Sequence, residues 1–230
     1  MNITPQEALE RCDTLMLDMD GTILDLAFDN YFWRELVPRC MARASAVDFD
    51  SARRELTELY AEREGSLDWY CLDYWSDALA LDLRALKTAS SHRIRFLPGA
   101  RDCLARLAGN GIRLVLVTNA HGTTLEIKRG VAGLDRYFDA FVTSHDFGRA
   151  KEDPGFWPAL RERLDFDPRR TAFVDDSPAV LDTARQQGLA DVIAVRRPDS
   201  SAPERDAVGE RSVASLGELD PAAAAAVTGS

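Results

Sequence analysis

The sequence predicts an α/β protein whose parallel sheet is covered by helices on both faces and interrupted by an inserted helical domain. In the second half, short apolar runs alternate with helix-like stretches, a pattern typical of doubly wound parallel sheets. The apolar run 15–17 precedes that alternation and stops at Asp18, as a buried strand does where it ends in a loop. Residues 27–93 show no clear strand and several helical spacings. We therefore expect a Rossmann-like core of residues 1–26 and 94–230, with a helical domain of residues 27–93.

Apolar runs and helical periodicity place the other elements of the core. Thr4 can cap a short helix that begins at Pro5. Strands that alternate with helices at this spacing indicate right-handed crossovers and a parallel sheet covered on both faces. The expected strands are residues 112–117, 138–143, 171–174 and 191–195. The expected helices are residues 5–12, 100–108, 123–131, 156–164, 178–188 and 213–219, and a low-complexity tail follows at residues 221–230.

Helical spacing also organises the inserted domain. Aromatic and leucine side chains recur every three or four residues from Phe28 to Leu36, and Pro38 is expected to interrupt that helix. Residues 50–64 are charged and favour a helix. The aromatic-rich residues 67–83 follow, and their spacing favours one further helix.

Composition argues against several classes of partner. The 230-residue chain carries 28 basic and 38 acidic residues, a formal net charge of −10. This balance argues against nucleic acid and anionic membranes, although one local cation can still bind a small anionic substrate. No apolar stretch approaches the roughly 20 residues that span a bilayer. The N-terminus lacks the basic-then-apolar order of a signal peptide, so we expect a cytoplasmic protein.

The cysteines of the chain are scattered. Cys12, Cys40, Cys71 and Cys103 form no CxxC pair. This spacing indicates reduced, mostly buried thiols and does not favour a zinc site.

Two carboxylates follow the first strand on alternate residues. Side chains alternate along a strand, so Asp18 and Asp20 start on the same face. Neighbouring carboxylates repel each other unless they share a cation or a proton, and a hard metal ion with oxygen ligands explains the pair most economically. The alternatives are a solvated turn after a core strand or a calcium-binding loop.

Polar side chains follow other core segments at the same edge of the sheet. In open parallel sheets, ligands bind at the carboxyl ends of the strands. Carboxylates, a lysine and a hydroxyl at this edge fit Mg²⁺ holding a phosphoryl group, with Asp18 and Asp176 as metal ligands. The hydroxyl of Thr118 could bind a phosphoryl oxygen, and Lys151 would neutralise charge there. The whole group consists of Asp18, Asp20, Thr118, Asn119, Lys151, Asp175 and Asp176.

Each member of this group also has a simpler explanation. Thr118 could end a strand, Lys151 could be a solvated loop lysine, and Asp175 with Asp176 could start a helix. Their order along the chain and their common placement favour the joint site.

Four motifs occur in this order: DMDGT at residues 18–22, VTN at 117–119, K-x-x-P at 151–154 and FVDDSP at 173–178. They resemble the four motifs of the haloacid dehalogenase superfamily, and the resemblance covers residues 14–195. The helical insertion after the first motif is similar to the cap domain of phosphatases in that superfamily.

The resemblance implies a phosphatase that acts through its own carboxylates. Asp18 would attack phosphorus and form an aspartyl phosphate; Asp20 would protonate the leaving oxygen and then take a proton from water. Asp18, the backbone carbonyl of Asp20 and Asp176 would hold Mg²⁺. Asp175 would bind it directly or through water. Val180 stands where the commoner fourth motif has a second acid, so which of the two neighbouring aspartates contacts the metal stays open. The implied phosphate-binding residues are Gly21, Thr22, Thr118, Asn119 and Lys151.

Further segments are similar to those of bacterial purine 5'-nucleotidases within the superfamily: LDLAFDNYFW, WYCLDYW, TNAH and FGRAKED. This likeness implies a nucleoside 5'-monophosphate substrate, with a preference for purines such as those of GMP and IMP. Aromatic side chains of the insertion could stack on a base, although most are expected to form the core of the insertion. The candidate substrate contacts are Asn30, Tyr74 and His121.

Other functions are compatible with the same fold. A phosphatase of sugar phosphates or other small phosphometabolites, or a phosphomutase, would use these motifs too. A carbon–halogen hydrolase needs no metal and usually lacks the second aspartate, so Asp20 argues against it. A binding protein without activity would normally have lost motif residues, and Asp18, Thr118 and Lys151 are all present.

Overall fold

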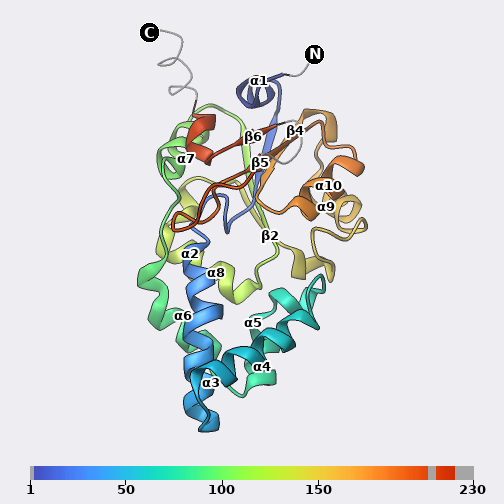
Figure 1. Ribbon diagram of the computed structural model, residues 1–230. Coiled ribbons are helices and arrows are strands. Elements are labelled where there is room, and N and C mark those ends of the chain that lie inside the picture. Colours follow the sequence, from blue (N-terminus) through green and yellow to red (C-terminus); the bar gives the residue numbers. More distant parts are fainter. Residues whose placement is uncertain (1–2, 207–210, 221–230) are drawn as a thin grey trace.

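A parallel six-stranded sheet forms the centre of the computed structural model, which describes residues 3–206 and 211–220. The strand order is β3-β2-β1-β4-β5-β6, so the first strand lies in the middle (Figure 1). Every pairing between neighbouring strands is parallel. The strands are β1 (Thr14–Leu17), β2 (Arg113–Thr118), β3 (Ala140–Thr143), β4 (Thr171–Asp175), β5 (Asp191–Val195) and β6 (Ser212–Val213).

Helices cover both faces of the sheet because its strands are apolar on both sides. In β1, Leu15 and Leu17 belong to one hydrophobic cluster, and Met16 between them belongs to a second cluster. The first cluster includes side chains of α1 (Pro5–Glu10), α7 (Ala100–Ala108) and α8 (Gly122–Ala132). The second includes side chains of α9 (Phe156–Leu164) and α10 (Pro178–Gln186). The doubly wound architecture expected from the sequence is confirmed.

The helical insertion of residues 27–93 forms a lobe below the sheet in Figure 1. It has its own hydrophobic cluster, which includes Phe32, Leu56 and Trp75. Its helices are α2 (Ala27–Tyr31), the π-helical turn η1 (Phe32–Leu36), α3 (Val37–Ser45), α4 (Phe49–Ala61), α5 (Leu72–Leu79) and α6 (Leu83–Ser90). Two 3₁₀ turns, η2 (Leu67–Tyr70) and η3 (Ser91–Arg93), complete it. The core carries η4 (Leu134–Arg136), η5 (Ser144–Phe147), η6 (Pro168–Arg170) and η7 (Leu216–Leu219).

The two chain segments that join the insertion to the core run side by side. Leu24 forms an antiparallel bridge with Phe96. The amide of Asp25 donates to the carbonyl of Arg95 at 2.9 Å, and the amide of Leu97 donates to the carbonyl of Ile23 at 2.9 Å. The insertion is therefore attached to the core through a paired double connection.

Two predictions within the insertion are wrong. Pro38 does not interrupt the first helix, which continues through α3 to Ser45 (Figure 1). The wider turn η1, in which the amide of Val37 donates to the carbonyl of Phe32, precedes the proline and accommodates its missing N–H. The single helix expected at residues 67–83 is divided, because the backbone at Cys71 is extended and that at Ala80 is left-handed.

The core agrees more closely with the sequence. All of the expected strands are present, and Thr4 forms a capping box with Glu7 at the start of α1. The helix expected at residues 213–219 is instead the short strand β6 followed by the turn η7. The predicted tail at residues 221–230 lies outside the described residues. Among residues 3–206 and 211–220, no helix has the length and apolar character needed to cross a membrane.

Candidate active site

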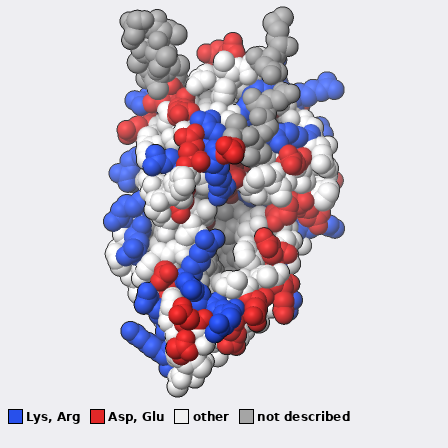
Figure 2. All heavy atoms as spheres, viewed as in Figure 1, with Lys and Arg blue, Asp and Glu red and all other residues white. Residues whose placement is uncertain are grey.

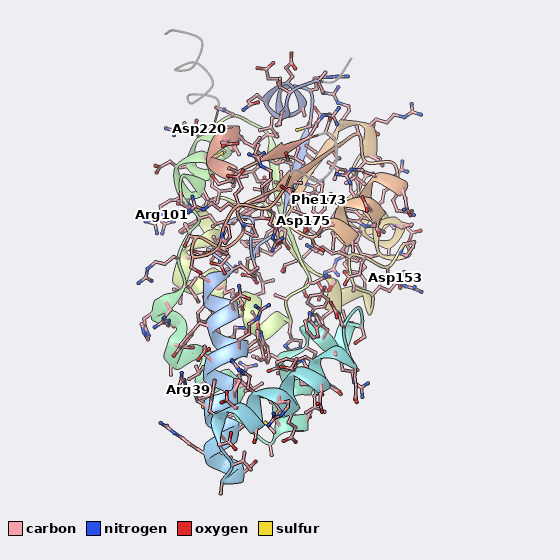
Figure 3. All side chains as sticks on the ribbon, in the orientation of Figure 1. Arg39, Arg101, Asp153, Phe173, Asp175 and Asp220 are labelled. Atoms are coloured by element: carbon pink, nitrogen blue, oxygen red, sulfur yellow. The ribbon has the colours of Figure 1, made fainter. Side chains whose placement is uncertain are left out.

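A cavity of about 370 Å³ lies between the carboxyl edge of the sheet and the helical insertion. Figure 2 shows the surface hollowed between the two lobes, with acidic and basic side chains interspersed around it. Figure 3 labels Asp175, at the end of β4, beside Phe173 near the centre of the molecule. The side chains that line this cavity include Asp18, Asp20, Thr118, Asn119, Lys151, Asp175 and Asp176.

Lys151 lies between two of these carboxylates. Its ammonium group contacts Oδ1 of Asp18 and lies 2.6 Å from Oδ2 of Asp175. It also donates to the carbonyl of Val117 at 3.1 Å, and its side chain is 2% exposed. Burial opposes the charge of this lysine, but the two carboxylates outweigh burial and raise the pKa of Lys151, so it is a permanent cation.

Three carboxylates could hold a metal ion at this point. Oxygen atoms of Asp18, Asp175 and Asp176 all lie within 4.8 Å of one another. Burial and the neighbouring Asp175 raise the pKa of Asp176 to about 7, and burial raises the pKa of Asp18 well above its ordinary value although Lys151 opposes this. One lysine therefore does not compensate three carboxylates, and their hard oxygen donors fit a divalent cation such as Mg²⁺.

Asp20 lies in a different electrostatic setting from Asp18. Its Oδ1 lies 2.5 Å from the ammonium of Lys128, which also contacts Asp29 of α2. Asp29 in turn lies 3.0 Å from the ammonium of Lys87 in α6. Burial raises the pKa of Asp20, and Lys128 opposes this shift. Burial also favours neutral Asp29, but Lys128 and Lys87 lower its pKa to about 2. These four side chains form a buried charged network between core and insertion.

All lysines of the chain belong to this region. The sequence contains three, and the other basic residues are arginines. Lys87, Lys128 and Lys151 are 1%, 0% and 2% exposed, and each contacts at least one carboxylate. Lysine is almost never fully buried without a partner, so these positions mark a site that needs fixed cations.

Comparison with known proteins agrees with this geometry. Residues 12–188 match the haloacid dehalogenase-like hydrolase family. The chain belongs to this family. The family expected from the four motifs is thus confirmed, and the chain is a hydrolase.

Two curated relatives and one solved structure extend the comparison. The chain is 40% identical over 198 residues to the GMP/IMP nucleotidase YrfG of Escherichia coli (strain K12), which covers 86% of this chain and 89% of that protein. It is 30% identical over 188 residues to a phosphoglycolate phosphatase of Nitrosospira multiformis, which covers 76% and 79%. The HAD phosphatase from Thermococcus onnurineus has the same fold, with a TM-score of 0.74 and 24% identity over 90% of this chain and 95% of that one.

The predicted phosphate-binding residues of this hydrolase divide into two groups. Thr118 and Asn119 line the cavity, and Asn119 accepts a hydrogen bond from the amide of Lys151 at 2.8 Å. Gly21 and Thr22 are not part of the cavity lining. Gly21 has a φ of +86°, and a Cβ there would lie 2.7 Å from the carboxyl carbon of Asp176. Gly21 therefore allows the two metal-site loops to approach each other.

Of the predicted substrate contacts, one lines the cavity and two lie outside its lining. Asn30 lines the cavity and donates to Asp199 at 2.7 Å. Tyr74 accepts a hydrogen bond from Arg63 at 2.7 Å and lies outside the lining. His121 also lies outside the lining, with its Nδ1 3.8 Å from Asp73.

An aromatic wall on the insertion faces the carboxylates. It consists of Trp33, Tyr60, Trp69, Tyr70 and Trp75. Most of these rings pack edge to face, as Tyr60 does against Trp75 with centroids 4.9 Å apart. The hydroxyl of Tyr70 donates to Glu152 of the core at 2.8 Å, and the amide of Asn119 donates to the same carboxylate at 2.8 Å. Glu152 thus joins the wall to the end of β2.

Sequence reasoning missed Lys87, Lys128 and Glu152. Lys128 follows an ordinary helical pattern, and only the fold brings its ammonium to Asp20 of the core and Asp29 of the insertion. The scarcity of lysine was the one available signal, because three lysines among 28 basic residues suggest positions that arginine cannot fill.

Replacing Gly21 by alanine should impair catalysis more than stability. The variant combines a left-handed backbone, which costs about 1–2 kcal/mol for an L-residue, with a collision against Asp176. Gly111→Ala is the matched control, because Gly111 has a φ of +76° and open space around its Cβ position. We expect both variants to lose unfolding free energy, Gly21→Ala by more because of the collision, and only Gly21→Ala to need more Mg²⁺ for phosphate release. If both variants reached full activity at the same Mg²⁺ concentration, the expected effect of the collision with Asp176 on the metal site would be contradicted.

Lys128→Met should destabilise the fold in a pH-dependent way. Removing one partner of a buried ion pair costs about 3–5 kcal/mol, whereas Arg129→Met, on the same helix, removes an exposed pair worth about 1 kcal/mol or less. Because folding lowers the pKa of Asp29, its ionised carboxylate stabilises the fold above the unfolded pKa of about 4. This stabilisation is lost as pH falls toward 2. Denaturant titrations should therefore show the largest deficit of Lys128→Met above about pH 5 and a shrinking deficit at lower pH. A deficit that grows on acidification would contradict this network.

Proposed function

We propose that this protein is a Mg²⁺-dependent phosphatase of nucleoside 5'-monophosphates, with a preference for purines, that acts through an aspartyl phosphate on Asp18. The observation that carries the proposal is the separation of two neighbouring carboxylates into different settings. Asp18 lies beside Lys151 and the metal-site carboxylates, whereas Asp20 lies beside Lys128. Carboxylates whose environments differ in this way can divide the tasks of nucleophile and acid.

The residues support the following sequence of steps. A carboxylate oxygen of Asp18 bonds to phosphorus, and the bond between phosphorus and the ester oxygen breaks. Asp20 donates its proton to that leaving oxygen, since burial raises its pKa and favours the protonated acid. Asp20 then accepts a proton from water, whose oxygen attacks the aspartyl phosphate and releases inorganic phosphate and free Asp18. Throughout, Lys151 offsets charge on Asp18.

The metal-site carboxylates complete this arrangement. When bound by Asp18, Asp175 and Asp176, Mg²⁺ would neutralise charge on the phosphoryl oxygens. Nη1 of Arg205 lies 3.3 Å from Oδ2 of Asp176 and offsets part of the negative charge of this carboxylate.

The aromatic wall supports a nucleotide substrate. A purine is flat and apolar on its faces, so it can pack against rings such as Trp33, Trp69 or Tyr70 while its phosphate lies at Asp18. The polar side chains of Asn30 and Arg34 on the same wall are available to the ribose or the base edge. The 40% identity to a GMP/IMP nucleotidase supports the same substrate class.

A substrate panel tests the specificity. Phosphate release should be measured for GMP, IMP, AMP, CMP, UMP, glucose 6-phosphate and phosphoglycolate, with Mg²⁺ and with a chelator. We expect kcat/KM for GMP and IMP to exceed that for the sugar phosphates by about tenfold or more, equivalent to ~1.4 kcal/mol of transition-state stabilisation. Chelation should abolish release. Equal values for sugar phosphates would refute the nucleotide proposal and favour the small-phosphometabolite alternative.

Two variants separate the chemical steps. With p-nitrophenyl phosphate the leaving group needs no proton, so Asp20→Asn should form the phosphoenzyme but hydrolyse it slowly. Rapid mixing should then show a burst of p-nitrophenolate equal to the enzyme concentration. Asp18→Asn should show no burst and a kcat lower by a factor on the order of 10⁴ or more, while the chain stays folded. Normal turnover by Asp18→Asn would exclude it as the nucleophile.

A further inference from the structure

A second cluster of metal-binding side chains lies beside the cavity, where the insertion meets the core. Cys71 is the N-cap of α5 in the insertion, His121 precedes α8, and His145 lies in η5. Ligand atoms of these three residues all lie within 4.8 Å of one another. The residues are separated by 50 and 24 positions in the sequence, so only the fold brings them together.

Two ring nitrogens of this cluster are buried without a hydrogen bond. Nδ1 of His121 and Nε2 of His145 are inaccessible and have no hydrogen bond among the described residues. The two rings meet edge to face, with centroids 5.0 Å apart. A buried polar atom without a partner costs about 1–3 kcal/mol, so these nitrogens indicate a missing binding partner.

The surroundings of His145 suit a metal ligand. The backbone of Asn119 lies next to its imidazole. Metal-binding histidines usually donate their second ring N–H to such a group, which fixes the tautomer and the ring orientation. Burial lowers the pKa of His145 to about 4, with a further contribution from His121, so the ring is neutral at pH 7.

We propose that Cys71, His121 and His145 bind Zn²⁺, and that the ion fastens the helical insertion to the core. One thiolate and two imidazoles are the donors that zinc prefers, whereas the carboxylates of the catalytic site suit Mg²⁺. Tetrahedral zinc needs ligand atoms about 3.3–3.6 Å apart, so these side chains need only a small approach to close around it. Water can take the fourth position, and Oδ1 of Asp73 lies 3.8 Å from Nδ1 of His121 as a further donor.

The site is placed where it can control access to the cavity. The amide of His121 already donates to the carbonyl of Tyr70 at 3.3 Å, and Tyr70 lines the cavity. An ion held by Cys71 from one side and two histidines from the other adds a strong link at the same contact. Resting on the proposed function, we expect bound Zn²⁺ to slow nucleotide turnover by restraining the opening of the insertion.

Cobalt provides a test that does not depend on activity. The full chain is titrated with Co²⁺ in excess Mg²⁺, which occupies the carboxylate site, and the sulfur-to-cobalt charge-transfer absorption is recorded. We expect one equivalent of Co²⁺ to produce this band and Zn²⁺ to displace it. Cys71→Ser should lose the band and keep its fold, because serine is also a good N-cap for α5.

Two further variants complete the test. Cys40→Ser, which removes another cysteine of the insertion, should keep the band. His145→Asn should weaken Co²⁺ binding by about tenfold or more. The site is refuted if the wild-type chain gives no band, if Cys71→Ser retains it, or if Cys40→Ser abolishes it.

The functional consequence is measured separately. One equivalent of Zn²⁺ should lower the rate of GMP hydrolysis in the wild-type chain and not in Cys71→Ser. Equal Zn²⁺ sensitivity in both would refute the restraining effect of the ion. A normal cobalt band in a chain that does not hydrolyse GMP would reject the nucleotide proposal and leave the zinc site standing.

Discussion

The ammonium of Lys151 between Asp18 and Asp175 is the contact on which the site depends. The parallel sheet brings these carboxylates to the same edge from adjacent strands, and their repulsion in a buried place must be offset. The fold fixes the lysine from several sides. Asn119 holds its backbone amide, Trp157 donates to its carbonyl at 2.9 Å, and the carbonyl of Val117 accepts from its ammonium. The loop that carries Lys151 is therefore tied by hydrogen bonds to the end of β2 and to α9.

A lysine ammonium also lies between two carboxylates around Asp20, but there the charged network joins the core to the insertion. Lys128 belongs to α8 of the core, whereas Asp29 and Lys87 belong to α2 and α6 of the insertion. Lys87 also lies 4.4 Å from the centroid of the Phe32 ring, within the aromatic cluster of the insertion. The ionisation of Asp20, the proposed catalytic acid, is thus coupled to the position of the insertion, because moving the insertion away removes Asp29 and Lys87 from this network.

Features that depend on short sequence patterns were predicted correctly, whereas contacts between residues distant in the sequence were not. The strand that delivers Asp18 and the placement of Thr118, Lys151 and Asp176 follow from short patterns, since apolar runs, their ends and the sheet edge are local or topological features. The turn η1 before Pro38 escaped prediction because a proline normally ends a helix, and tolerance for it depends on the surrounding packing. Lys128 and the cluster of Cys71, His121 and His145 were missed because their partners are distant in the sequence and meet only in the folded chain. The expectation against a zinc site rested on cysteine spacing alone, which does not show the histidines that the fold brings close to Cys71.

The distribution of basic residues has a practical consequence. All three lysines are buried around the cavity, and the positive charge of the rest of the chain comes from arginine. Reagents that acylate lysine amines therefore find no exposed lysine while the lobes are together. The speed with which such a reagent labels the lysines would report how often solvent reaches the charged network, so acylation kinetics can record the opening of this molecule without substrate and without an attached probe.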